Sequence, residues 1–317
     1  MFEPEYVKRQ IDLLLSYGIR DFEITGGEPS ECRNLREYCE YIKQKSSSSK
    51  IAVITNGGLF ASDVWDVIDE VLLSYHLGRN TSGADMSYFP RGCTYEKAAK
   101  TAARAAISGK LLRVNVVVGK FNVQALDSAV DDIVGFCPRI VNFLPVNTFD
   151  GAKAQYTQID YRTAGAAMSR QLDRLDEKLP DTLKIVRYAP FCSMPGRERH
   201  IVGTFQHIFD WFDWNVELTG LRILDLLNDA DALKKLGPYG STSFSEADRY
   251  RQESYEKSPQ CLKCRYLYVC DGVEKTPGHI LLKCIKPCAG IFLKNVNGYI
   301  GKYTGKLYNK LYGKSGD

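Results

Sequence analysis

The sequence lacks the features of a membrane-spanning or secreted protein. None of its apolar runs approaches the roughly 18 residues that a membrane-spanning helix needs. Its first residues, Met1–Glu5, show no basic stretch followed by an apolar one, so we expect no signal peptide. The charge is nearly balanced, with 42 Lys and Arg against 38 Asp and Glu, which argues against an extended nucleic-acid-binding surface. We therefore expect a cytoplasmic protein with no nucleic-acid partner.

Cysteine, in contrast, is abundant. Ten cysteines is a high count for a reducing compartment, where clustered thiols indicate metal or redox chemistry rather than disulfides. Five of them are scattered over the first two thirds of the chain. The clustered five are Cys261, Cys264, Cys270, Cys284 and Cys288.

The first half of the chain alternates strand and helix patterns. Apolar spacing predicts strands at residues 21–25, 51–55, 70–75, 111–118 and 140–145. It predicts helices from Tyr6 to the turn at Gly18 and at residues 35–45, 61–68, 95–108 and 123–136. Such alternation is typical of parallel strands joined by right-handed helical crossovers. Because the pattern opens on a helix, we expect one more strand and its loop upstream of Met1.

The rhythm changes after Asn147, and we place a domain boundary near Asp150. A further helix is predicted at residues 161–178, followed by a strand at 183–187.

The first predicted strand ends in Gly26-Gly27-Glu28-Pro29. In parallel α/β folds, ligands bind at the carboxyl ends of the strands. Two glycines let the backbone approach a ligand closely, and Glu28 then presents a carboxylate. The alternative is a plain strand-to-loop turn with Glu28 in solvent.

Residues Asp21–Pro29 resemble the radical SAM superfamily, whose second barrel strand ends in Gly-Gly-Glu-Pro. In that family the motif's carboxylate and backbone hold the methionine amino group of S-adenosylmethionine. Further segments resemble the family's strands three to six in order: Ile54–Gly57, Ser74–His76, Val114–Val117 and Asn142–Pro145. The resemblance covers residues 1–150. It implies an α/β fold, a partial (β/α)6 TIM-like barrel that lacks its first strand.

The resemblance also implies a set of residues that bind S-adenosylmethionine. They are Thr25, Gly26, Gly27, Glu28, Pro29, Asn56, Ser74, His76, Asn115, Asn142, Leu144 and Pro145. Other roles stay open for three of them. Asn56 can be a turn former, while Asn115 and His76 can be buried polar groups satisfied by structural hydrogen bonds.

A second candidate site is Cys261-x-x-Cys264-x5-Cys270. Three cysteines within ten positions can converge on one metal centre, and both iron–sulfur clusters and zinc accept four thiolates. The stretch resembles the SPASM/twitch-like domains that follow radical SAM barrels and hold an auxiliary [4Fe–4S] cluster. That resemblance implies Cys192 as the remaining ligand.

The sequence has no Cys-x3-Cys-x2-Cys loop. Radical SAM enzymes carry this triad after their first strand, where three thiolates leave one iron open for S-adenosylmethionine. Cys284 and Cys288 have only the first spacing, and we interpret them as free or structural thiols. We favour an N-terminal truncation over a true loss of the loop. The full-length protein is then expected to be an enzyme, whereas the activity of the chain as given depends on that loop.

The layout implies a partial barrel at residues 1–150, a cysteine-rich α+β auxiliary-cluster region at 151–290 and a basic Tyr/Lys tail at 291–317. The tail has a helical spacing suited to a membrane surface, but its glycines favour a docked or frayed end.

The implied reaction is oxidoreductase-type hydrogen-atom abstraction by a 5′-deoxyadenosyl radical on a peptide, sugar or cofactor precursor. The implied electron donor is a reductase, flavodoxin or ferredoxin. Two rival functions remain open: a non-catalytic iron–sulfur electron carrier or scaffold, and a zinc-stabilised α/β binding protein.

Overall fold

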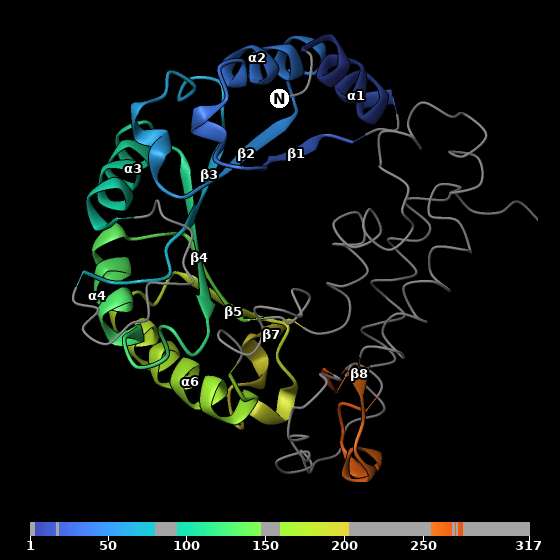
Figure 1. Ribbon diagram of the computed structural model, residues 1–317, viewed down its shortest axis with the longest axis vertical. Helices are drawn as coiled ribbons and strands as arrows, with labels where there is room; N and C mark the ends of the chain where they lie inside the picture. Colours follow the sequence, from blue (N-terminus) through green and yellow to red (C-terminus); the bar gives the residue numbers. More distant parts are fainter. Residues whose placement is uncertain are drawn as a thin grey trace, which may run out of the picture.

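The computed structural model describes residues 4–16, 19–79, 94–146, 159–202, 255–267, 270 and 272–274. Its main body is one sheet of seven parallel strands that follow one another in sequence order. The strands are β1 (Asp21–Ile24), β2 (Lys50–Thr55), β3 (Glu70–Ser74), β4 (Leu111–Val118), β5 (Ile140–Pro145), β6 (Leu183–Arg187) and β7 (Ile201–Val202). The sheet curves into an arc, which is the partial barrel that the sequence predicts (Figure 1).

The α-helices lie on the convex side of this arc (Figure 1). They are α1 (Pro4–Ser16), α2 (Leu35–Lys45), α3 (Tyr95–Ile107), α4 (Leu126–Phe136) and α6 (Tyr161–Lys178). Short 3-10 helices are η1 (Pro29–Glu31), η2 (Gly58–Ala61), η4 (Phe191–Ser193), η5 (Glu198–His200) and η7 (Pro259–Lys263). A separate antiparallel pair is formed by β8 (Tyr255–Glu256) and β9 (Val273–Glu274).

Strand β4 shows why the sheet has two different faces. Every second residue from Leu112 to Val118 is buried in the core shared with the helices, whereas Arg113, Asn115 and Val117 are partly exposed. Because side chains alternate across a strand, this second set lies on the concave face. Partly exposed polar groups of the sheet therefore lie on its concave face.

An ionic network on the concave face links β4 to the edge strand β1. The Arg113 guanidinium contacts the carboxylates of both Glu70 on β3 and Glu23 on β1. Ala52 of β2 pairs in register with both glutamates, and its small side chain leaves room for the guanidinium to cross. The network therefore steadies the strand that carries the Gly-Gly-Glu-Pro loop.

The helix predicted at residues 61–68 is wrong. The chain there forms η2 and a turn, in which the Trp65 indole N–H donates to the carbonyl of Leu59 at 3.2 Å. Val64, Trp65 and Ile68 are buried by this turn, which explains apolar spacing that resembles a helix. The sheet also continues past the boundary predicted near Asp150, because β6 pairs with β5. The division of the chain into domains stays a prediction.

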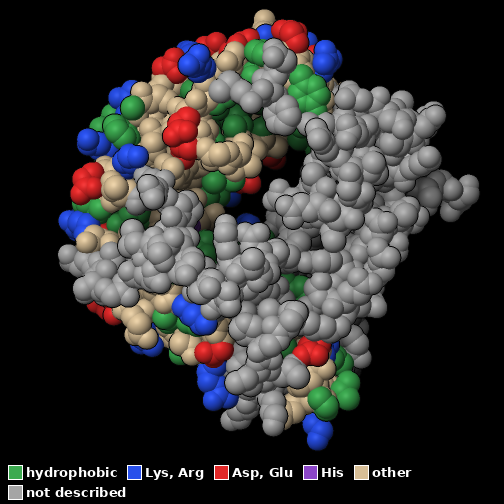
Figure 2. Space-filling view, viewed as in Figure 1, with side chains coloured by type: hydrophobic (Ala, Val, Ile, Leu, Met, Phe, Trp, Pro, Cys, Tyr) green, Lys and Arg blue, Asp and Glu red, His purple; other side chains and the backbone are tan. Residues whose placement is uncertain are grey.

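Within the described part of the chain, no helix is long and apolar enough to cross a membrane. Charged side chains of both signs intermix along the convex rim of the arc (Figure 2). The tail at residues 291–317, predicted to be a docked or frayed end, lies outside the described residues, as do Cys284 and Cys288.

Candidate functional site

The carboxylate of Glu28 joins the ends of β1 and β2. Its Oε1 accepts from the Thr55 hydroxyl at 2.6 Å and from the Ser30 N–H at 3.2 Å, and its Oε2 accepts from the Asn56 N–H at 2.7 Å. The alternative of a turn with Glu28 in solvent is therefore wrong. The carboxylate holds the loop in shape, because three protein donors already occupy it.

The two glycines before Glu28 present open backbone. Gly26 has a φ of +139°, which favours glycine, and both Gly26 and Gly27 are exposed. A Cβ added to either would meet no atom within 4 Å. Thr25 beside them is also exposed, whereas Pro29 after Glu28 is buried. The loop therefore offers peptide groups, rather than a free carboxylate, to a ligand at this end of the sheet.

The loop after β2 packs closely against its surroundings. Gly57 has a φ of +100°, and a Cβ on Gly58 would lie 2.4 Å from the Ser30 hydroxyl oxygen. The Asn56 side-chain oxygen accepts from the Gly58 N–H at 3.3 Å, so Asn56 does form the turn. Its predicted contact with a cofactor stays a prediction.

Three of the predicted site residues form one polar row across the sheet. Ser74 of β3 pairs in register with Asn115 of β4, which pairs with Asn142 of β5. The Asn142 amide N–H donates to the Asn115 side-chain oxygen at 2.8 Å. Asn142 is only 2% exposed, and its own side-chain oxygen has no hydrogen-bond partner among the described residues. Leu144 and Pro145 end the same strand β5.

His76 is held between the ends of β3 and β4. Its Nδ1 accepts from the Val117 N–H at 3.1 Å, and its carbonyl accepts from the Asn122 amide at 2.8 Å. Burial lowers the pKa of His76 to about 4, against an opposing hydrogen bond to the Asn115 backbone. His76 is therefore neutral at physiological pH, and its structural role is established by these bonds, while its predicted cofactor contact stays a prediction.

His76 should make the fold less stable in mild acid. Its pKa is about 4 in the folded state and about 6.5 in an unfolded chain. Its contribution is therefore complete above pH 6.5 and is lost as the pH falls toward 4, because only the unfolded chain takes up the proton in that range. Allowing for partial exposure, we expect a loss of roughly 1–2 kcal/mol. Urea unfolding at several pH values should show this slope, and His76→Asn should flatten it. Equal slopes for the two proteins would contradict the assignment.

Sequence reasoning missed Asp132. This carboxylate accepts from the Tyr75 hydroxyl at 2.6 Å and from the Arg79 N–H and Nε at 2.8 and 2.6 Å. The Arg79 guanidinium lies over the Tyr95 ring, 4.0 Å from its centroid. Asp132 thus fastens the segment that follows β3 to helix α4. The available signal was an acid that shares the buried face of α4 with apolar residues. Ala129, Val130, Asp132 and Ile133 are all buried, whereas Asp131 is exposed.

The four cysteines of the predicted auxiliary site line one pocket. Cys192 follows β6, whereas Cys261, Cys264 and Cys270 come from the segment between β8 and β9. None of these four described cysteines forms a disulfide bond. The Cys264 N–H donates to the Cys261 carbonyl at 2.9 Å, a short turn that turns the two residues toward one pocket.

Zinc and an iron–sulfur cluster are both candidates for this pocket. Among the described residues, no three His, Cys, Asp or Glu side chains lie close enough together to hold one metal ion. A zinc site needs thiolates about 2.3 Å from the same ion. An iron–sulfur cluster is also held by cysteine thiolates.

No family model matches the chain. A probable GTP 3′,8-cyclase from Sulfurisphaera tokodaii is 26% identical to it over 141 residues, which are 41% of this chain and 42% of that protein. The chain thus matches about two fifths of the length of this curated relative.

Among the solved structures that match most of the chain are two with bound peptides. SuiB of Streptococcus suis, bound to its precursor peptide SuiA, matches with a TM-score of 0.55 and 15% identity over 88% of this chain and 68% of SuiB. The enzyme anSMEcpe, with bound AdoMet and the Kp18Cys peptide, matches with a TM-score of 0.54 and 13% identity over 98% of this chain and 91% of its own. This chain has the radical SAM fold. The predicted radical SAM fold, a partial barrel, is confirmed, whereas the SPASM/twitch-like domain and the truncation stay predictions.

Proposed function

We propose that this protein is a radical SAM enzyme that binds S-adenosylmethionine on the concave face of its barrel and an auxiliary [4Fe–4S] cluster beside it. The observation that carries the proposal is the pocket lined by Cys192, Cys261, Cys264 and Cys270, next to a sheet with the radical SAM fold. Cys192 is far in the sequence from the other three, and its approach to them in one pocket supports a shared metal centre.

Two features support S-adenosylmethionine as the barrel ligand. The exposed backbone of Gly26 and Gly27 is suited to bind the amino group of the methionine end. The unpartnered side-chain oxygen of Asn142 is a buried acceptor, and buried acceptors normally have a donor. An adenine amino group would supply one.

When bound, S-adenosylmethionine would accept one electron from a reduced [4Fe–4S] cluster other than the auxiliary one, release methionine and supply the radical for hydrogen-atom abstraction from the substrate. The residues of this chain bind and orient: Glu28 shapes the loop, and neutral His76 fixes the end of β3. An electron donor of the reductase, flavodoxin or ferredoxin type belongs to this proposal.

We favour a peptide as the substrate. SuiB and anSMEcpe, whose structures match most of this chain, are each also seen with a bound peptide, SuiA in one and Kp18Cys in the other. The match to the probable GTP 3′,8-cyclase covers a smaller part of the chain. A sugar or a cofactor precursor is therefore the weaker choice.

The auxiliary site is tested by anaerobic reconstitution with iron and sulfide. We expect about four iron and four labile sulfide per chain and a loss of most of both in Cys264→Ala. Cys137→Ser is the control, because Cys137 is exposed and does not line the pocket. Bound zinc without labile sulfide would overturn the cluster. A reconstituted protein that fails to bind S-adenosylmethionine would instead favour the electron carrier.

A further inference from the structure

The turn that carries Cys192 packs tightly against helix α6. A Cβ added at Gly165 would lie 2.1 Å from the carbonyl oxygen of Ser193 and 2.8 Å from its carbonyl carbon. Gly165 is buried in the interior of α6, where glycine is a poorer helix former than alanine. The absence of a side chain at Gly165 therefore allows η4 to approach the helix this closely.

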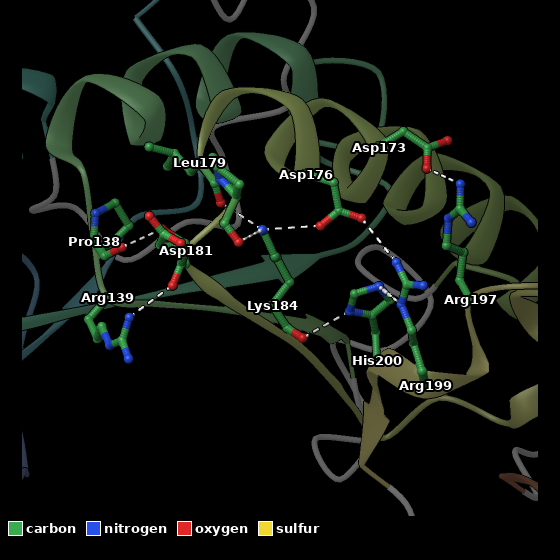
Figure 3. Close-up of polar contacts among 12 residues, drawn as sticks. Pro138, Arg139, Asp173, Asp176, Leu179, Asp181, Lys184, Arg197, Arg199 and His200 are labelled. Atoms are coloured by element: carbon green, nitrogen blue, oxygen red, sulfur yellow. Dashed lines mark hydrogen bonds and ion pairs between the residues drawn. The ribbon is translucent and has the colours of Figure 1, made fainter.

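The segment after η4 is tied to the same helix by two ion pairs. Asp173 pairs with Arg197, and Asp176 pairs with Arg199 at 3.3 Å (Figure 3). The acids project from successive turns of α6, and both arginines follow the Cys192 turn within a few residues. The contacts of this segment therefore extend along the helix from Gly165 toward its C-terminal end.

A buried lysine anchors the far end of these contacts. The Lys184 side chain is 4% exposed, and its Nζ donates to the Leu179 carbonyl at 2.6 Å and contacts Asp176 at 3.1 Å. Burial alone would raise the pKa of Asp176, but the hydrogen bond and charge of Lys184 outweigh it and lower that pKa. The Lys184 carbonyl lies 3.1 Å from the Nδ1 of His200, whose Nε2 accepts from Arg199 at 3.1 Å (Figure 3).

The segment that follows Cys192 also contacts the segment that carries Cys261, Cys264 and Cys270. The rings of Phe191 and Tyr266 stack at 4.2 Å between centroids with an interplanar angle of 10°. Arg265 pairs with Glu198 at 3.7 Å. Residues 191–200 therefore lie between α6 and the Cys261–Cys270 segment, and contact both.

We propose that helix α6 sets the position of the Cys192 thiol relative to Cys261, Cys264 and Cys270, with Gly165 and Asp176 as its positioning residues. The role toward a cluster rests on the proposed function. The placement of the thiol does not, because it follows from packing in the metal-free chain.

The first test compares two glycines in helices. Gly165→Ala forces the Ser193 backbone away from α6, whereas Gly135→Ala, in α4, adds a Cβ with no atom within 4 Å. After reconstitution we expect iron and sulfide to fall about fivefold or more in Gly165→Ala, with an altered electron paramagnetic resonance signal. Gly135→Ala should match the unsubstituted protein in both.

The second test reads the thiol itself, without metal. Cys192 is 9% exposed, so we expect slow maleimide labelling, detected by mass spectrometry. In the Gly165→Ala variant, maleimide should label Cys192 about tenfold faster than in the unsubstituted protein. The labelling rate of the exposed Cys137 should not change. Asp176→Asn, which keeps the side-chain shape, should give a smaller increase and serves if Gly165→Ala does not fold.

The outcomes separate the two proposals. Unchanged Cys192 labelling in both variants overturns the role of α6, whatever the protein binds. Faster Cys192 labelling in a protein that takes up no cluster keeps that role and removes the auxiliary cluster. Faster labelling together with cluster loss supports both.

Discussion

Replacing Asp132 with alanine should lower the free energy of unfolding by about 3 kcal/mol, because three hydrogen-bond donors lose the carboxylate that they share. The carboxylate is 2% exposed and accepts from Tyr75 and twice from Arg79. A hydrogen bond to a charged, buried group contributes more than a neutral one. Water can reach the half-exposed Arg79 side chain, but it does not readily replace the acceptor at the buried Tyr75 hydroxyl. The loss should appear as a lower urea midpoint.

Asp131→Ala is the matched control for this substitution. Asp131 is the preceding residue of α4, but it is 65% exposed and pairs with Arg174 at the surface. Removing such a pair typically changes stability by less than about 1 kcal/mol. If the two variants unfold at the same urea concentration, the Asp132 contacts do not contribute as described. A selective loss in Asp132→Ala would show that the segment after β3 is fastened through α4.

The regular part of the fold was predictable because its patterns are local. The bounds predicted for β4, β5, β6, α2 and α6 agree with the structure, since alternating or helical apolar spacing continues over each whole element. The helix predicted at residues 61–68 was wrong because Val64, Trp65 and Ile68 have the apolar spacing of a helix but are buried by a turn. The two-residue strand β7 gave no signal, because its existence depends on pairing with β6.

The place of the candidate site in the fold could be predicted from the sequence, whereas most of its side-chain contacts could not. The Gly-Gly-Glu-Pro loop marks the carboxyl end of β1, but the direction of the Glu28 carboxylate depends on Thr55 and Asn56, from the next strand and its loop. The association of Cys192 with the later cysteines came from a family resemblance. Nothing in the spacing shows that Phe191 stacks on Tyr266, or that Gly165 leaves room for the Cys192 turn.

Replacing Glu28 with glutamine should weaken S-adenosylmethionine binding by roughly tenfold or more, a change of about 1.4 kcal/mol. The carboxylate accepts three donors on two oxygens, from Ser30, Thr55 and Asn56. A glutamine has only one side-chain oxygen, so its NH2 group would face a donor on one side. The loop should then leave the end of β2, and the peptide groups of Gly26 and Gly27 would lose the geometry in which they meet the ligand.

Glu31→Gln is the control, because Glu31 is exposed in η1 and its substitution makes the same change of charge nearby. Equilibrium dialysis against S-adenosylmethionine measures the affinity, and hydrogen exchange at residues 25–30 reports the loop. Equal affinities for the two variants would show that a carboxylate at Glu28 is not needed. Weaker binding with unchanged loop exchange would assign Glu28 a direct ligand contact. Weaker binding together with faster exchange is the expected result, since the Glu28 carboxylate is already used by the protein itself.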